Sequence, residues 1–158
     1  MSVENKKSNS QVDVIRITKA LVVMLGVMTL AAVAFSKFIS EYIVYCCIGE
    51  LNQMKVYFTM GVIFLAAIAA FALLYFLLKL LNNLSKGKVF VKDNITNLKA
   101  VATGLIAIAA VGAIGSFLID FTVLFISFLM LFVALIVICV ELVFKKAIEM
   151  KDELDLTV

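Results

Sequence analysis

A single long polar passage interrupts the middle of this apolar chain: LLNNLSKGKVFVKDNITNLK, from Leu80 to Lys99. It carries four lysines against one acid, Asp93. On each side of it lies an apolar run about long enough to cross a lipid bilayer. This arrangement predicts that the passage is a cytoplasmic loop between two pairs of membrane-spanning helices.

The composition of the chain is typical of a membrane protein. Apolar residues make up 65% of the 158 positions, charged residues only 16%, and the mean hydropathy is +1.16. A soluble domain is roughly half apolar and about a quarter charged. Because the apolar residues come in blocks of about 20 rather than in short alternating strips, they predict helices and exclude a β-barrel.

We therefore predict an all-α integral membrane protein with one domain over residues 1–158 and a cytoplasmic loop at 82–99. Its four transmembrane helices are expected, as two antiparallel hairpins, at about 17–38, 56–81, 100–119 and 121–144. The segment 39–55 either prolongs the first helix or forms a short helix at the outer surface. It carries an apolar stripe at helical spacing: Ile39, Ile43, Cys47 and Leu51.

The basic residues predict the orientation of the chain. Of the 14 lysines and arginines, all but Lys37 and Lys55 lie in or beside the amino terminus, the central loop or the tail. Since Lys- and Arg-rich short loops stay inside, both termini and the loop are expected on the cytoplasmic side of a bacterial cell membrane. The lysines have no aromatic or arginine-rich companion surface, so direct nucleic acid binding is not expected.

Turn and helix signals predict the ends of the helices around the central loop. Gly87 stands where a helix C-terminal cap needs a residue that tolerates positive φ. Asp93 or Asn94 is expected to cap a new helix that begins near Ile95. After the fourth span, the tail 145–158 keeps a weak apolar stripe and can prolong the helix into the cytoplasm.

Small residues mark where the helices can pack closely. The third span is the richest in them, with Ala100, Gly104, Gly112 and Ser116 at spacings of four or eight. Close backbone approach drives helix association in lipid. The spacing fits packing within one chain, and it also fits a seam between two copies in a homo-oligomer.

The sequence excludes several kinds of chemistry. It contains no histidine, the commonest ligand and general base, and no acid or base deep in a span, so we expect neither a metal, a cofactor nor catalysis. An ion-coupled carrier normally needs such a group near the midplane. Cys46 and Cys47 are adjacent, unlike the Cys-x-x-Cys pair of thiol oxidoreductases, and fit an apolar stripe, a disulfide or an acylation site.

The central loop also carries a family pattern of leucine, glycine, hydrophobic-phenylalanine, asparagine and leucine-basic: Leu84, Gly87, Val89, Phe90, Asn94, Leu98 and Lys99. In this it resembles the YoaS-like small bacterial membrane proteins, whose function is unknown. Where that family usually has arginine, this chain has Lys99. The resemblance implies four spans and no catalytic residue. Such proteins are often encoded beside a small helix-turn-helix regulator, which implies a cytoplasmic DNA-binding partner.

Two functions follow from these observations. The first is a non-enzymatic bacterial membrane protein that holds or regulates a cytoplasmic transcription regulator. Its partner-binding residues are expected to be Lys86, Lys88, Phe90, Lys92 and Lys99. The alternative is a small oligomeric transport or envelope-defence protein. The simplest role for the same loop is a connector whose lysines meet anionic headgroups of the lipid bilayer.

Overall fold

The chain is all-helical in the part that the structure describes, a computed structural model covering residues 2–49, 52–117 and 121–155. The helices of this part are α1 (Ser2–Ala34), α2 (Ser36–Ile48), α3 (Gln53–Ser85), α4 (Lys92–Ser116) and α5 (Thr122–Asp155). All except α2 are long and apolar enough to cross a membrane. The four long helices indicate a multi-pass membrane protein.

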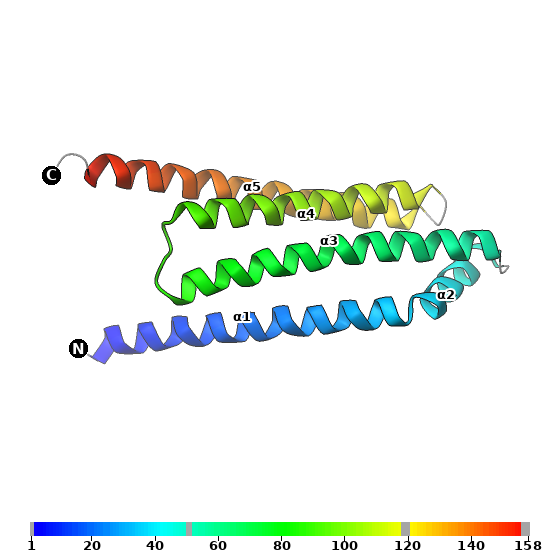
Figure 1. Cartoon of the computed structure of the whole chain (residues 1–158), viewed down its shortest axis with the longest axis horizontal. Coiled ribbons are helices and arrows are strands. Elements are labelled where there is room, and N and C mark those ends of the chain that lie inside the picture. Colours follow the sequence, from blue (N-terminus) through cyan, green and yellow to red (C-terminus); the bar gives the residue numbers. More distant parts are fainter. Residues whose placement is uncertain (1, 50–51, 118–120, 156–158) are drawn as a thin grey trace.

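The long helices lie side by side in an open row with the order α1, α3, α4, α5 (Figure 1). Among the described residues, α1 contacts α3 but approaches neither α4 nor α5, so the row does not close into a ring. Successive long helices run in opposite directions (Figure 1). The first turns of α1, the connection between α3 and α4 and the last turns of α5 therefore gather at one end, which we call the loop end.

The core of the row is centred on α4. In its apolar window 33% of residues are buried, against 6% in α1 and in α3 and 11% in α5. Val101 and Leu105 of α4 pack with Ala134 of α5, and side chains of α3 lie against them: Leu73, Phe76 and Leu77. The large apolar side chains left exposed on α1 and α5 suit a lipid environment, in which burial from water does not drive helix association.

Two glycines of α4 allow close approach to its neighbours within the chain. A Cβ atom on Gly104 would lie 3.3 Å from Cβ of Leu73 in α3. A Cβ atom on Gly112 would overlap Oγ of Ser127 in α5. These two positions of the small-residue pattern are therefore used inside one chain.

The segment after the first span is a bent continuation of α1. The N–H of Phe35 donates to the carbonyl of Ala31 at 2.9 Å, and the carbonyl of Phe35 accepts from the N–H of Ile39 at 3.0 Å. Hydrogen bonding thus passes through the bend. The direction changes because ψ at Phe35 is 15°, far from the usual helical value.

The buried stripe of α2 differs from the one read in the sequence. Ser36, Ser40 and Val44 are buried, and α2 packs against α3. Ile39 and Ile43 are only half-buried, while the side chain of Cys47 and the whole of Leu51 lie outside the described residues. The reason is that small side chains let two helices approach, whereas large ones are accommodated by lipid.

α5 continues far beyond the apolar span predicted to end at 144. It runs to Asp155, and Ile148 in the added part is only 5% exposed. We call residues 145–155 the α5 extension. The tight connection predicted at Asp120 lies outside the described residues.

Candidate functional site

The loop that follows α3 turns sharply at Gly87, which has a φ of 71°. The N–H of Gly87 donates to the carbonyl of Leu84 and the N–H of Lys88 to that of Asn83, each at 3.0 Å. These two bonds form a Schellman motif and satisfy carbonyls at the end of α3. The left-handed conformation they need favours glycine at this position.

α4 starts about three residues earlier than the sequence predicts. The helix begins at Lys92 rather than near Ile95, and Val91, rather than Asp93 or Asn94, occupies the cap position without a side-chain capping bond. Asp93 is exposed in the first turn, where its negative charge complements the partial positive charge of the helix end. Asn94 therefore lies inside the first turn of the helix, and its side chain hydrogen-bonds to carbonyls of the preceding loop.

Asn94 fixes the loop against both helices. Its side chain is fully buried, and its Nδ2 donates to the carbonyls of Lys88 at 2.8 Å and Val89 at 2.7 Å. Its Oδ1 accepts from Nδ2 of Asn83 in α3 at 2.8 Å. Both amide hydrogens are used, so this one side chain ties α3, the loop and α4 together.

The loop also contacts the α5 extension and the end of the last span. The Nζ of Lys92 lies 3.7 Å from Oδ2 of Asp152, and the ring centroids of Phe90 and Phe144 are 6.0 Å apart. The ion pair is exposed and stabilises little, whereas an aromatic pair contributes about 0.5–1.5 kcal/mol beyond its buried area. Together the two contacts join the loop and the first turn of α4 to the last part of α5 in one continuous surface.

Four of the five predicted partner-binding residues lie on this surface. Lys86, Lys88, Phe90 and Lys92 are all exposed in the loop or in the first turn of α4. We call them, with the α5 extension, the loop-end surface. Lys99 is separate: it lies two turns further along α4 and lines a groove between α3 and α4.

Lys19 is a residue of the loop end whose role the sequence analysis missed. It lies in α1, and its Nζ donates to Oδ1 of Asn82 at 2.7 Å and to Oγ of Ser85 at 3.1 Å, both in the last turns of α3. In the sequence Lys19 counted only among the basic residues near the amino terminus that predict the orientation of the chain. The signal for this contact is a lysine near the start of the first span and a polar Asn-Asn-x-Ser segment at the end of the second, which an antiparallel pair of helices brings to the same height.

Asn97 was also missed. Its side chain is fully buried in α4, one turn after Asn94, yet neither Oδ1 nor Nδ2 has a hydrogen-bond partner in the described part of the chain. A buried amide without partners costs roughly 1–3 kcal/mol. Asn97 therefore does not contribute to the rigidity that Asn94 gives the loop.

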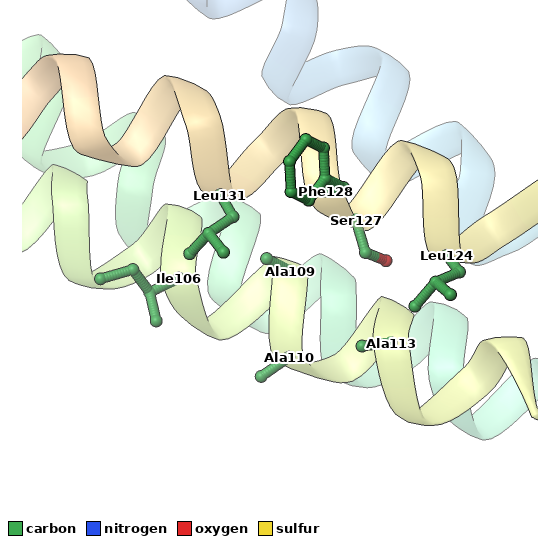
Figure 2. A pocket seen from close by; sticks show the side chains of 8 residues that line it. All are labelled: Ile106, Ala109, Ala110, Ala113, Leu124, Ser127, Phe128 and Leu131. Atoms are coloured by element: carbon green, nitrogen blue, oxygen red, sulfur yellow. The ribbon is translucent and has the colours of Figure 1, made fainter.

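A cavity of about 390 Å³ lies between α4 and α5, away from the loop end. The side chains that line it are drawn in Figure 2. Its lining is apolar except for Ser127, whose hydroxyl donates to the carbonyl of Val123 at 2.8 Å. The other side chains that line it are Ile106, Ala109, Ala110, Ala113, Leu124, Phe128 and Leu131. With no acid or base among them, this cavity suits hydrocarbon and does not suit catalysis.

The thiols of Cys46 and Cys139 are free and exposed. Cys46 lies in α2 and Cys139 in α5, and the side chain of Cys47 lies outside those described. The contact with Cys46 raises the pKa of Tyr42 above its usual value, chiefly through a side-chain hydrogen bond. Both residues belong to α2, which lies at the end of the row opposite the loop end (Figure 1).

A family model described as "Protein of unknown function (DUF2975)" matches residues 4–158. No curated protein and no solved structure matches the chain.

Proposed function

The chain belongs to the DUF2975 family of proteins of unknown function, and we propose from its own surface that it is a non-enzymatic protein that holds a cytoplasmic partner at the bacterial cell membrane. Its four long helices cross the bilayer as two antiparallel hairpins. The excess of lysines at the loop end supports placing that end, with both termini, in the cytoplasm.

The observation that carries this proposal is the attachment of the loop and the first turn of α4 to α5. Lys92 pairs with Asp152 in the α5 extension, and Phe90 packs against Phe144 just before it. Asn94 fixes the loop from inside. A surface that is already ordered does not pay the entropy of ordering when a partner binds. A plain connector would not need a buried anchor and a second attachment to α5.

The character of the loop-end surface supports a partner with an acidic face. Lys86 and Lys88 are exposed and have no carboxylate partner among the described residues. Phe90 follows these two lysines in the loop and is 50% exposed. It therefore offers an apolar contact beside the basic side chains. Complementary charge steers association and selects the partner, and aromatic side chains are enriched at interface centres.

The resemblance of the loop to the YoaS-like proteins supports a helix-turn-helix transcription regulator as this partner. Held at the membrane, the regulator is kept from DNA, and a signal that weakens the contact releases it. The chain itself does not contact DNA. The oligomeric transport alternative gains no support from Gly104 and Gly112, since both positions pack within the chain.

The test is site-specific photo-crosslinking in intact cells with the full-length protein. A photoreactive residue in place of Lys88 is expected to capture a cytoplasmic protein, whereas one in place of Met54, at the opposite end of the row, is not. The charge reversals Lys86→Glu and Lys88→Glu leave the Lys92–Asp152 pair intact and are expected to abolish capture by a photoreactive residue at Phe90.

The matched control reverses Lys37 and Lys55, which lie at the opposite end, and is expected to leave capture unchanged. The proposal fails if no cytoplasmic protein is captured at Lys88 or Phe90. It also fails if both pairs of charge reversals reduce capture equally, because the basic loop then has no specific role.

A further inference from the structure

A groove of about 460 Å³ runs between α3 and α4 on the loop-end half of the row. Its lining is rich in small residues: Ala69, Ala72, Ala100, Gly104 and Ala107. The floor is closed where Gly104 approaches Leu73, since a Cβ atom there would lie 3.3 Å from Cβ of Leu73. In the described part of the chain no other helix covers this groove, because only α3 and α4 line it.

Two lysines lie on the helix faces that form this groove, in its loop-end part. Lys99 is part of the lining. Lys79 follows Ala72 and Phe76 at helical spacings of seven and three, so it shares their face of α3. Because α3 ends at Ser85 and α4 begins at Lys92, both lysines lie roughly 10 Å below the loop at 1.5 Å per residue.

The charge of these two lysines is not balanced within the chain. Both side chains are exposed, and neither has a carboxylate within ion-pair distance among the described residues. The two threonines of the groove do not add donors, because Thr96 and Thr103 direct their hydroxyls to the carbonyls of Lys92 and Lys99. The donors that remain in the loop-end part of the groove are cationic, which selects for an anion.

We propose that this groove binds an anionic phospholipid of the loop-end leaflet, with an acyl chain along the small residues and the phosphate between Lys79 and Lys99. Lysines at this depth extend their ammonium groups towards the headgroup layer. A headgroup phosphate there meets two cations on either side of the chain-binding groove. This proposal does not depend on the protein partner proposed for the loop-end surface.

A second copy of the chain fits the groove less well. In a two-fold symmetric contact each copy presents the same residues, so Lys79 and Lys99 of both copies would gather in one interface. Like charges brought together without partners are destabilising. The cavity of Figure 2 differs from this groove because no charged side chain lines it. It can accept a hydrocarbon chain, but it cannot distinguish lipids by the charge of their headgroups.

The test is native mass spectrometry of the purified full-length protein in detergent with phosphatidylglycerol or phosphatidylcholine of identical chains at equal concentration. The wild-type protein is expected to retain phosphatidylglycerol about tenfold better, equivalent to roughly 1.4 kcal/mol. The double variant Lys79→Gln, Lys99→Gln is expected to lose this preference. The matched control Lys86→Gln, Lys88→Gln removes the same charge from the loop and is expected to keep it.

A second variant tests the chain-binding part of the groove. Ala107 is exposed in the groove lining, so Ala107→Phe fills the groove without entering the core and is expected to reduce retention of both lipids. The proposal is overturned if the wild-type protein shows no preference, if the loop variant loses it as fully as the groove variant, or if Ala107→Phe changes nothing. A dimer that forms in place of lipid adducts and is lost with Ala107→Phe assigns the groove to a second copy and also overturns it.

Discussion

Gly112 of α4 and Ser127 of α5 lie so close that a Cβ atom added to the glycine would overlap the hydroxyl oxygen of the serine. Ser127 is only 7% exposed, and its hydroxyl donates to the carbonyl of Val123 in its own helix. The absence of a side chain at Gly112 therefore sets how closely α4 and α5 pack. In lipid such close approach is a principal source of helix association.

The substitution Gly112→Ala is expected to destabilise the protein by about 1 kcal/mol relative to Gly61→Ala. Ser127 has to leave its rotamer and give up its bond to Val123, which costs on this order. Gly61 is the matched control, because it is also inside a helix and nothing lies within 4 Å of its Cβ position. The measurement is the free energy of unfolding by denaturant titration in detergent micelles.

A double-mutant cycle with Ser127→Ala separates this contact from other effects of the alanine. Without Oγ, the nearest serine-derived atom is Cβ at 3.5 Å, an ordinary contact. The cost of Gly112→Ala is therefore expected to fall to that of Gly61→Ala in the Ser127→Ala background. An unchanged cost in that background would show that the two residues do not limit the packing of α4 on α5.

Two asparagines of α4 are expected to respond in opposite ways to replacement by leucine. Asn94→Leu leaves the carbonyls of Lys88 and Val89 and the amide of Asn83 without their bonds, at about 1–3 kcal/mol for each buried group that finds no water. Asn97→Leu breaks no bond among the described residues and is expected to be neutral or stabilising.

Hydrogen exchange of the loop amides 86–91 checks this difference, together with the free energy of unfolding. Asn94→Leu is expected to speed exchange at least tenfold in the loop, whereas Asn97→Leu leaves it unchanged. Since both residues are fully buried in one helix, each variant is the control for the other. Equal destabilisation by the two variants would contradict the separate roles assigned to them.

The sequence predicted the features of the fold that local patterns encode. The length of each apolar block indicated four helices able to span a membrane, as the structure has them. The weak apolar stripe of the tail indicated that the last helix can continue past 144, and Ile148 is buried there. Helix propensity and hydrophobic period act over neighbouring residues, so one sequence is enough to read them.

The features that the sequence did not predict depend on contacts between distant residues. Asn94 looks like a helix cap by type and position, yet its bonds to Lys88 and Val89 form only once the loop folds back over it. The stripe Ser36, Ser40 and Val44 is less apolar than its neighbours and is buried because it permits close packing on α3. Lys99 belongs to the central polar passage in sequence, but the register of α4 carries it into a groove.

Gly87→Ala is expected to destabilise the end of α3 by about 1–2 kcal/mol, the cost of a left-handed conformation for an L-residue with a side chain. Nothing lies within 4 Å of the Cβ position, so the cost comes from the backbone alone. Gly87→Asn is the matched control and is expected to cost less, because asparagine tolerates this conformation. Unfolding free energies in detergent measure both variants, and an equal cost for alanine and asparagine would contradict the backbone explanation.

The proposed orientation predicts which end of the row an impermeant thiol reagent reaches in intact cells. In a background without the three native cysteines, Met54→Cys is expected to be labelled from outside, because Met54 is 79% exposed at the end opposite the loop. Lys88→Cys is expected to be labelled only after lysis, since the loop end carries most of the basic residues and moving them across the membrane is unfavourable. Removing one lysine leaves that imbalance in place. If Lys88→Cys is labelled in intact cells and Met54→Cys is not, the loop-end surface faces outward, and the proposal of a cytoplasmic partner is excluded, whereas the lipid groove keeps its selectivity in the other leaflet.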